Sequence, residues 1–261
     1  MLEIYLVPLG VALVGFVIIW PASVVRRDVS LVDLAWGPGF FVQLCAAALV
    51  AGALDLRGQM VLAVVGIWSA RLAWTLGARR FREGHEDPRY TSIRESWGPA
   101  FWWKSIFIVF ALQAFLQWLI VVGPIAGLAA EPQALGALAW IGVATALGGL
   151  ALEAVADRQL DTFKRTAQPG ALMTSGLRAH MRHPNYTGEI IFWIGVALIL
   201  VDGGVWLGLL SPVLITLFLT KVSGAPLLDE RLSETRPGYA AYRARVPGFI
   251  PFLTPERSNA S

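Results

Sequence analysis

Long apolar runs recur along this chain, and each is long enough to cross a bilayer as a helix, which takes about 20 residues. Charged residues make up only 15% of the sequence, against roughly a quarter in an ordinary soluble domain. We therefore expect an all-α, polytopic membrane protein. The seven predicted spans are residues 4–20, 31–54, 59–79, 101–123, 134–157, 185–201 and 203–221.

The basic residues set the expected orientation. Nearly all of the 21 Lys and Arg residues lie in segments 21–30, 79–104 and 158–182 and in the tail that begins at residue 221. Because basic residues favour the cytoplasmic side, we expect the N-terminus outside and the C-terminus in the cytoplasm. An odd number of spans requires the same arrangement.

The spans leave no room for a separate globular domain. We expect one seven-helix transmembrane domain over residues 1–253 and a disordered tail over 254–261. The first apolar run lacks the basic start and clear cleavage site of a signal peptide, so it is interpreted as a retained helix. One cysteine and three histidines without zinc-like spacing predict no disulfide and no metal site.

A polar, basic stretch precedes the sixth span. Arg182 and His183 gather positive charge at a predicted helix N-terminus that begins with Pro184, where an anion is favoured. Glu189 lies inside the apolar run, where a carboxylate is costly unless it faces protein, water or a ligand. A basic membrane anchor needs neither Asn185 nor Glu189, so we predict a ligand site and keep the anchor as the alternative.

Two further charges lie within the predicted spans. Asp33 is near the start of the second span, either as the partner of a Ser30 helix cap or beside a cavity opened by a kink at Pro38. Arg71 lies near the middle of the third span, where an unpaired arginine is costly. We expect a carboxylate such as Asp33, or a ligand, beside Arg71; a snorkelling side chain is the alternative.

Glu153 and Asp157 end the fifth span on one helix face, four residues apart. Like charges at that spacing repel, so basic side chains or the donor groups of a nucleotide should offset them. A metal pair and a solvated helix end are the alternatives. Farther on, Lys221 is placed to contact a phosphate, while Tyr239 and Tyr242 share a side of a short helix and either stack on a flat ring or pack at the membrane interface.

Several motifs then carry a family resemblance. They are Asp33-Leu34-Ala35-Trp36-Gly37, Asp87-Pro88-Arg89-Tyr90, Glu153-x-x-x-Asp157-x-Gln159, Arg182-His183-Pro184-Asn185-Tyr186-x-Gly188-Glu189, Lys221-x-Ser223-Gly224 and Tyr239-x-x-Tyr242. With these motifs the chain resembles the bacterial DUF1295 membrane proteins, within the wider steroid 5-alpha-reductase-like superfamily.

The resemblance implies a membrane reductase that holds NADPH in a cavity open to the cytoplasm. It would transfer a hydride to a C=C bond conjugated to a carbonyl in a lipophilic, steroid- or isoprenoid-like substrate. The cytoplasmic segments expected to form the mouth of this site are 21–30, 79–104, 158–184 and 222–253. The residues predicted to bind NADPH are Glu153, Asp157, Lys164, Arg165, Arg182, His183, Asn185, Glu189, Lys221, Tyr239 and Tyr242.

The predicted catalytic residues are Asp33, Trp68 and Arg71. Related steroid reductases use a glutamate from the second helix and a tyrosine from the third; Asp33 matches the glutamate, and Trp68 stands at the tyrosine's position. Because an indole N–H is not a useful proton donor, Arg71, one turn away, is expected to polarise the carbonyl instead.

Two other functions fit parts of the sequence. The run from Arg182 to Gly188 also resembles S-adenosylmethionine-dependent isoprenylcysteine and phospholipid methyltransferases, and Asp229 and Glu230 fit that interpretation. A non-catalytic lipid-binding membrane protein is the third possibility. Besides the substrate, we expect contact with membrane lipids, no nucleic-acid partner, a monomeric state and a location in the bacterial inner membrane.

Overall fold

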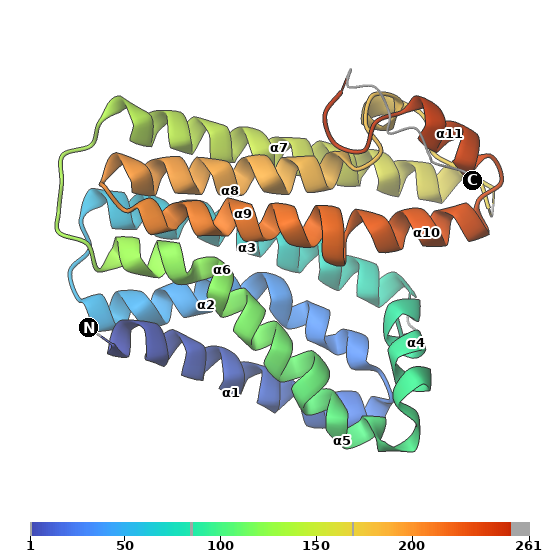
Figure 1. The fold of residues 1–261 in the computed structure, drawn as a ribbon, viewed down its shortest axis with the longest axis horizontal. Helices are drawn as coiled ribbons and strands as arrows, with labels where there is room; N and C mark the ends of the chain where they lie inside the picture. Colours follow the sequence, from blue (N-terminus) through green and yellow to red (C-terminus); the bar gives the residue numbers. More distant parts are fainter. Residues whose placement is uncertain (1, 84–85, 169, 252–261) are drawn as a thin grey trace. The chain divides into compact units, whose positions relative to one another are not determined.

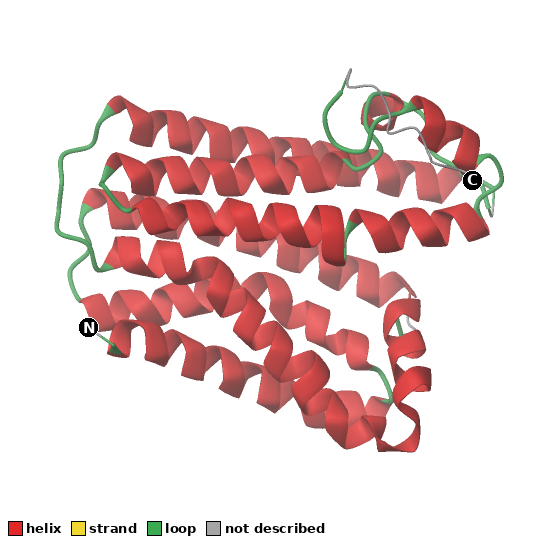
Figure 2. Ribbon diagram, in the orientation of Figure 1, coloured by secondary structure: helices red, strands yellow, loops and turns green. Residues whose placement is uncertain are grey.

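The computed structural model describes residues 2–83, 86–168 and 170–251, and these form helices joined by loops, with no strand among them (Figure 2). The α-helices, labelled in Figure 1, are α1 (Glu3–Arg26), α2 (Val32–Ala51), α3 (Leu56–Glu83), α4 (Pro88–Trp97), α5 (Phe101–Ser105), α6 (Leu112–Leu128), α7 (Ala137–Thr166), α8 (Pro184–Asp202), α9 (Leu210–Leu217), α10 (Ala225–Thr235) and α11 (Tyr239–Arg245). Short 3₁₀ turns are η1 (Val29–Leu31), η2 (Gly98–Ala100), η4 (Gly176–Ala179) and η5 (Trp206–Leu209), and π-helical turns are η3 (Ile106–Ala111) and η6 (Phe218–Val222). The all-α prediction is confirmed for this part of the chain.

The described residues contain seven helical stretches long and apolar enough to cross a membrane, which confirms the predicted number. These stretches are Glu3–Arg26, Val29–Ala51, Leu56–Phe81, Pro88–Leu128, Ala137–Thr166, Pro184–Asp202 and Trp206–Thr235. The orientation, with the N-terminus outside, stays a prediction.

The helices extend well beyond the predicted spans at the basic end. Helix α7 runs to Thr166 rather than 157, because no proline or glycine interrupts residues 158–166, so Lys164 and Arg165 lie on its last turn. The segment predicted as a loop before residue 101 contains α4, and the tail after 221 contains α10 and α11. Hydropathy marks only the apolar part of each helix, and polar helical extensions lack that signal.

The chain groups into two compact units, each described by itself below. Unit 1 comprises Met1–Trp140 and Val196–Ser211, and unit 2 comprises Ile141–Gly195 and Pro212–Ser261. The predicted single domain over 1–253 stays a prediction, and the predicted disordered tail, 254–261, lies outside the described residues.

In unit 1, α2 packs against α1, α3 and α6, and a buried amide pair holds α2 to α6. Gln43 Nε2 donates to Gln117 Oε1 at 2.7 Å, and Gln117 Nε2 donates to the Trp36 carbonyl at 2.6 Å. The Gln117 side chain occupies the space that a Cβ on Gly39 would need. The glycine beside Pro38 therefore makes room for an interhelical hydrogen bond, and the predicted cavity beside Asp33 stays a prediction.

The end of unit 1 that is predicted to face outward holds a buried ion pair. Arg57, 3% exposed, lies 2.8 Å from the Asp202 carboxylate and also donates to the carbonyls of Ile199 and Ala134. Asp202 in turn accepts from the Gly136 N–H. A basic residue that sequence places on the outer side is thus neutralised within the protein.

Gly149 in α7 lies where the backbones of α7 and α8 approach closely in unit 2. A Cβ at Gly149 would overlap the backbone of Gly188 and Phe192, whereas a Cβ at neighbouring Gly148 meets open space. We expect Gly149→Ala to destabilise the protein by about 1–3 kcal/mol, the usual cost of overpacking. Gly148→Ala should leave the unfolding midpoint unchanged or slightly higher, since alanine favours helix. Thermal unfolding in detergent measures both, and equal effects would contradict this packing.

Candidate functional site

An acid and a phenol share a hydrogen bond in unit 1. The Tyr90 hydroxyl of α4 donates to Asp33 Oδ1 of α2 at 2.7 Å. Gln113 Nε2 of α6 donates to the Tyr90 oxygen at 2.9 Å, and Arg89 Nη2 lies 3.2 Å from Asp33 Oδ2. Because the Tyr90 oxygen accepts from Gln113, its own proton is directed at the carboxylate. Three helices therefore fix one exchangeable proton in a definite place.

The start of α4 explains how the sequence places these groups. Asp87 caps the helix: its side chain accepts from the Arg89 N–H at 2.9 Å, and Pro88 occupies the first helical position. Asp87 Oδ1 also lies 3.1 Å from Arg89 Nε. Burial alone would raise the pKa of Asp87, but the hydrogen bonds and charge of Arg89 lower it. The cap thus holds Arg89 beside Asp33 and sets Tyr90 one residue further on.

Tyr90 is a site residue that sequence reasoning missed. The motif Asp87-Pro88-Arg89-Tyr90 was recognised, but residues 79–104 were expected to be a loop, and the tyrosine's role fell to Trp68. The Asp-Pro pair, a helix-start signature, was the available signal.

The structure places the other two predicted catalytic residues on α3. Trp68 is fully buried and packs edge-to-face on Phe40, with ring centroids 5.3 Å apart. The Arg71 carbonyl accepts from the Thr75 hydroxyl one turn later. Asp33 stands in the acid cluster as described, while the catalytic roles of Trp68 and Arg71 stay predictions.

A second cluster, in unit 2, gathers around Asp229 of α10. Arg182 Nη2 lies 3.0 Å from Asp229 Oδ2, and His183 Nε2 lies 2.9 Å from Oδ1. The Tyr239 hydroxyl donates to Oδ1, and Arg243 Nε is 3.9 Å from Oδ2. Asp229 thereby ties the basic stretch before α8 to the C-terminal helices. Three predicted cofactor residues are held together by a carboxylate that was not predicted to join them.

His183 is buried beside Asp229 and stacks on Tyr186, with ring centroids 5.6 Å apart. Burial lowers the pKa of His183; Asp229 opposes this shift, and the charges of Arg182 and Arg178 add to it. Burial and the hydrogen bond to Asp229 raise the pKa of Tyr239. At neutral pH, the cluster therefore contains a neutral imidazole and a neutral phenol.

The lowered pKa of His183 predicts a loss of stability in acid. An unfolded chain binds a proton at this position near pH 6.5, whereas the folded chain binds it only at lower pH, so stability falls as the pH drops below about 6.5. The unfolding midpoint should decrease between about pH 7.5 and 5.5, and His183→Gln should flatten that slope. His180→Gln, at an exposed histidine in the same stretch, should leave it in place. An unchanged slope in His183→Gln would contradict the assignment.

The second predicted tyrosine is also held by the protein. The Tyr242 hydroxyl donates to the Arg178 carbonyl at 2.6 Å, and Arg178 Nη1 donates to the Arg182 carbonyl at 2.7 Å. Tyr239 and Tyr242 lie on one side of α11, as predicted, with ring centroids 5.9 Å apart, and both are buried. Their rings fasten α11 to the basic stretch, which adds a structural role to the predicted one.

The Asn185 side chain of unit 2 has a buried oxygen that lacks a hydrogen-bond donor in the described part of the chain. Its Oδ1 is buried and has no hydrogen-bond partner among the described residues. It lies in the first turn of α8, three residues before Gly188, where a Cβ would collide with the Glu153 side chain. Glu153 is itself 3% exposed. A buried amide oxygen normally finds a donor, so this oxygen is free to accept a hydrogen bond from an amide or hydroxyl group.

The remaining predicted cofactor residues of unit 2 differ in their exposure to solvent. Asp157 of α7 and Glu189 of α8 are partly buried. Lys164, Arg165 and Lys221 are exposed at the basic ends of their helices. In unit 2 the predicted acids and the Asn185 amide oxygen are thus buried or partly buried, whereas the predicted bases Lys164, Arg165 and Lys221 are exposed.

Comparison with known proteins decides the family. Residues 19–246 match the family described as "Protein of unknown function (DUF1295)". The chain belongs to the DUF1295 family. The predicted resemblance is confirmed at this level, and the matched DUF1295 region contains both the Asp33–Tyr90 pair and the Asp229 cluster.

A relative from Schizosaccharomyces pombe extends the comparison. An uncharacterized protein of Schizosaccharomyces pombe is 25% identical to the chain over 273 residues, covering 90% of the chain and 76% of the relative. No solved structure matches the chain. Because that relative is a eukaryotic protein, the bacterial location of this DUF1295 chain stays a prediction.

Proposed function

We propose that this protein is a membrane-embedded, NADPH-dependent reductase of a C=C bond conjugated to a carbonyl in a lipophilic substrate. The observation that carries the proposal is the 2.7 Å hydrogen bond between Tyr90 and Asp33. It provides a positioned proton donor within the helical stretches that are apolar enough to span a membrane. A carbonyl that enters from the bilayer could accept this proton.

The residues of unit 1 suit the stabilisation of an enolate. A bound NADPH would supply the hydride to the β carbon of the substrate. The Tyr90 hydroxyl would then donate to the carbonyl oxygen, where negative charge develops, the kind of interaction that usually contributes most to such a reaction. Gln113 and Arg89 would stabilise the charge left on the phenol, since Gln113 donates to its oxygen and Arg89 lies 5.6 Å from its ring centroid. A solvent proton would then reach the α carbon while the enol O–H returns its proton to the Tyr90 phenolate, which gives the saturated carbonyl product and regenerates Tyr90.

The residues of unit 2 fit a nucleotide. The buried, unpartnered oxygen of Asn185 requires a donor, which the carboxamide or the ribose hydroxyls of NADPH would provide. The exposed bases Lys164, Arg165 and Lys221 suit the phosphates. This fit supports NADPH as the cofactor without identifying the substrate.

The methyltransferase alternative loses one of its two expected carboxylates, Asp229, and keeps Glu230. Asp229 already accepts from Tyr239 and pairs with Arg182 and His183. A carboxylate with these partners is poorly suited to bind a sulfonium or a ribose as well. The reductase is therefore the better supported of the two functions.

Cofactor binding distinguishes the candidates. The full chain, purified in detergent, should gain thermal stability with NADPH and show no gain with S-adenosylmethionine. A ligand at 100 times its Kd raises stability by about 2.7 kcal/mol, which is readily seen in an unfolding midpoint. Stabilisation by S-adenosylmethionine alone would replace the proposal with the methyltransferase, and a response to neither would favour a lipid-binding protein.

A further inference from the structure

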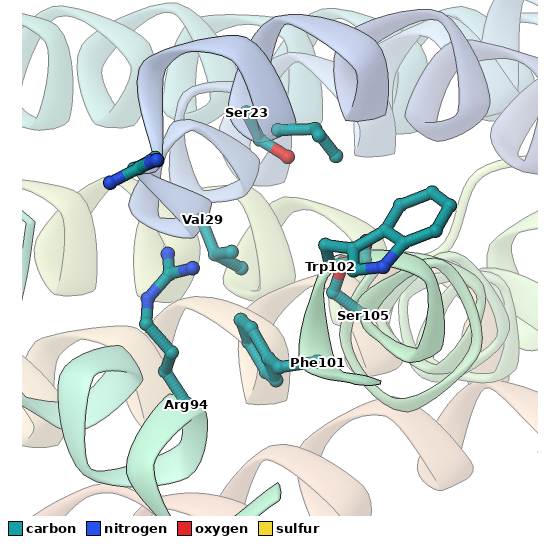
Figure 3. A pocket seen from close by; sticks show the side chains of 8 residues that line it. Ser23, Val29, Arg94, Phe101, Trp102 and Ser105 are labelled. Atoms are coloured by element: carbon teal, nitrogen blue, oxygen red, sulfur yellow. The ribbon is translucent and has the colours of Figure 1, made fainter. Parts of the chain in front are cut away.

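Unit 1 contains a pocket of about 310 Å³ whose lining includes neither Asp33 nor Tyr90. Figure 3 shows Arg94 rising beside Phe101 toward Val29, with Trp102 and Ser105 across the pocket. The polar and aromatic residues that line it are Ser23, Arg27, Arg94, Phe101, Trp102 and Ser105. They come from the end of α1 and from α4 and α5, at the basic end of unit 1.

The charge at this pocket is positive. Arg27 forms no side-chain hydrogen bond or ion pair with the rest of the described chain. Arg94 pairs with Glu86, with Nη2 2.6 Å from Oε1, and its guanidinium carbon lies 4.8 Å from the Phe101 ring centroid. That pair leaves the Arg27 charge uncompensated. Beside it, Arg26 is exposed and adds a further positive charge.

Arg27 also occupies an unusual backbone position. It ends α1 with φ 53°, the left-handed conformation that favours glycine, and it is the sole non-glycine residue with positive φ in the described ranges. Its N–H donates to the Val24 carbonyl at 3.2 Å. Glycine would adopt this backbone conformation more easily, so the conformation itself gives no reason for an arginine. The reason for arginine at this position is therefore its side chain, which lines the pocket.

Exposed tryptophans near the pocket indicate its expected depth in a bilayer. Trp97, Trp102 and Trp103 are 45%, 56% and 44% exposed, and Trp102 lines the pocket. Lys104 Nζ lies 4.9 Å from the Trp97 ring centroid and 5.8 Å from that of Trp103. Tryptophan and lysine side chains collect where headgroups meet water. This pattern predicts that the pocket lies at headgroup depth.

We propose that this pocket binds the phosphate group of an anionic phospholipid. The phosphate would lie between Arg27 and the free side of the Arg94 guanidinium, while the acyl chains follow the apolar helices into the membrane. Guanidinium groups bind phosphate with strong, charge-assisted hydrogen bonds. An anionic headgroup suits the excess of arginines better than a zwitterionic one, whose ammonium group would approach Arg26 and Arg27. This inference does not depend on the proposed reductase activity.

Titration of short-chain lipids into the detergent-purified full chain tests the proposal. Dioctanoyl phosphatidylglycerol should bind at least about tenfold more tightly than dioctanoyl phosphatidylcholine, as measured by native mass spectrometry. Arg27→Gln should weaken phosphatidylglycerol binding about tenfold, the loss expected for hydrogen bonds to a charged group. Arg26→Gln, one residue earlier and outside the pocket lining, should change it less than about twofold.

Competition by inorganic phosphate distinguishes a lipid headgroup from a soluble phosphate ligand as the occupant of the pocket. A lipid site predicts no competition by millimolar phosphate, because the acyl chains contribute to binding. Competition that is lost in Arg27→Gln would keep the phosphate site but assign it to a soluble ligand. Equal losses in the two variants, or equal binding of both lipids, would overturn the proposal. A Val24→Phe variant, which fills the pocket without changing charge, should also reduce binding.

Discussion

Replacing Tyr90 with phenylalanine is expected to lower reductase turnover by about 10²–10³-fold, because this variant lacks the proton that stabilises the developing enolate. The Asp33 carboxylate keeps its ion pair with Arg89, so the fold should survive with a loss of about 1 kcal/mol for one hydrogen bond. The measurement is NADPH oxidation by the purified protein with a panel of lipophilic enones. Unfolding midpoints should be recorded alongside it.

Tyr5→Phe is the matched control for this variant. It removes the same hydroxyl in the same unit, and that hydroxyl has no partner among the described residues. It should keep wild-type turnover, whereas Asp33→Asn should share the defect of Tyr90→Phe. Turnover within a few-fold of wild type in Tyr90→Phe would remove Tyr90 from the mechanism and return attention to Trp68 and Arg71.

Asn185→Leu is expected to separate stability from function. In the nucleotide-free protein, the change removes a buried, unpartnered oxygen, so the unfolding midpoint should stay the same or rise. The affinity for NADPH should fall at least about tenfold, since a buried hydrogen bond to the ligand is lost. A merely structural residue would show the opposite pattern, with lower stability and unchanged affinity.

The Asn185 experiment compares thermal unfolding with and without NADPH and derives the Kd by titration. Gly148→Ala serves as a control from the same unit, because its Cβ meets open space and it should bind nucleotide normally. If Asn185→Leu binds NADPH as tightly as the wild type, the buried amide oxygen does not mark the cofactor site.

Hydropathy alone predicted the number of spans, because burial in lipid requires long apolar runs and little else produces them. It also placed Asp33, Glu153 and Asn185 inside helices, where the structure finds them. Hydropathy did not predict the polar helices α4 and α10, because they contain too few apolar residues. Tyr90 was therefore placed in a predicted loop and Asp229 in the predicted tail. Those two residues organise the clusters of the two units.

Side-chain contacts between residues far apart in the chain could not be predicted from the sequence either. The partners of Asp33 lie 56 and 57 residues away, and those of Asp229 in the basic stretch lie some 46 and 47 residues before it. Local spacing rules concern residues three or four apart and carry no information on such contacts. Cap chemistry was the exception, since Asp87-Pro88 indicates a helix start wherever it occurs.

Deuteride transfer would detect the proposed reduction itself. Membranes that contain the full chain would be supplied with NADPH deuterated at the transferred position of C4, and their lipids examined by mass spectrometry. We expect a lipid product that gains one deuterium and one solvent proton, formed by wild type and Tyr5→Phe and lost in Tyr90→Phe. Absence of deuterium from every lipid, or transfer of a labelled methyl group from S-adenosylmethionine, would contradict it.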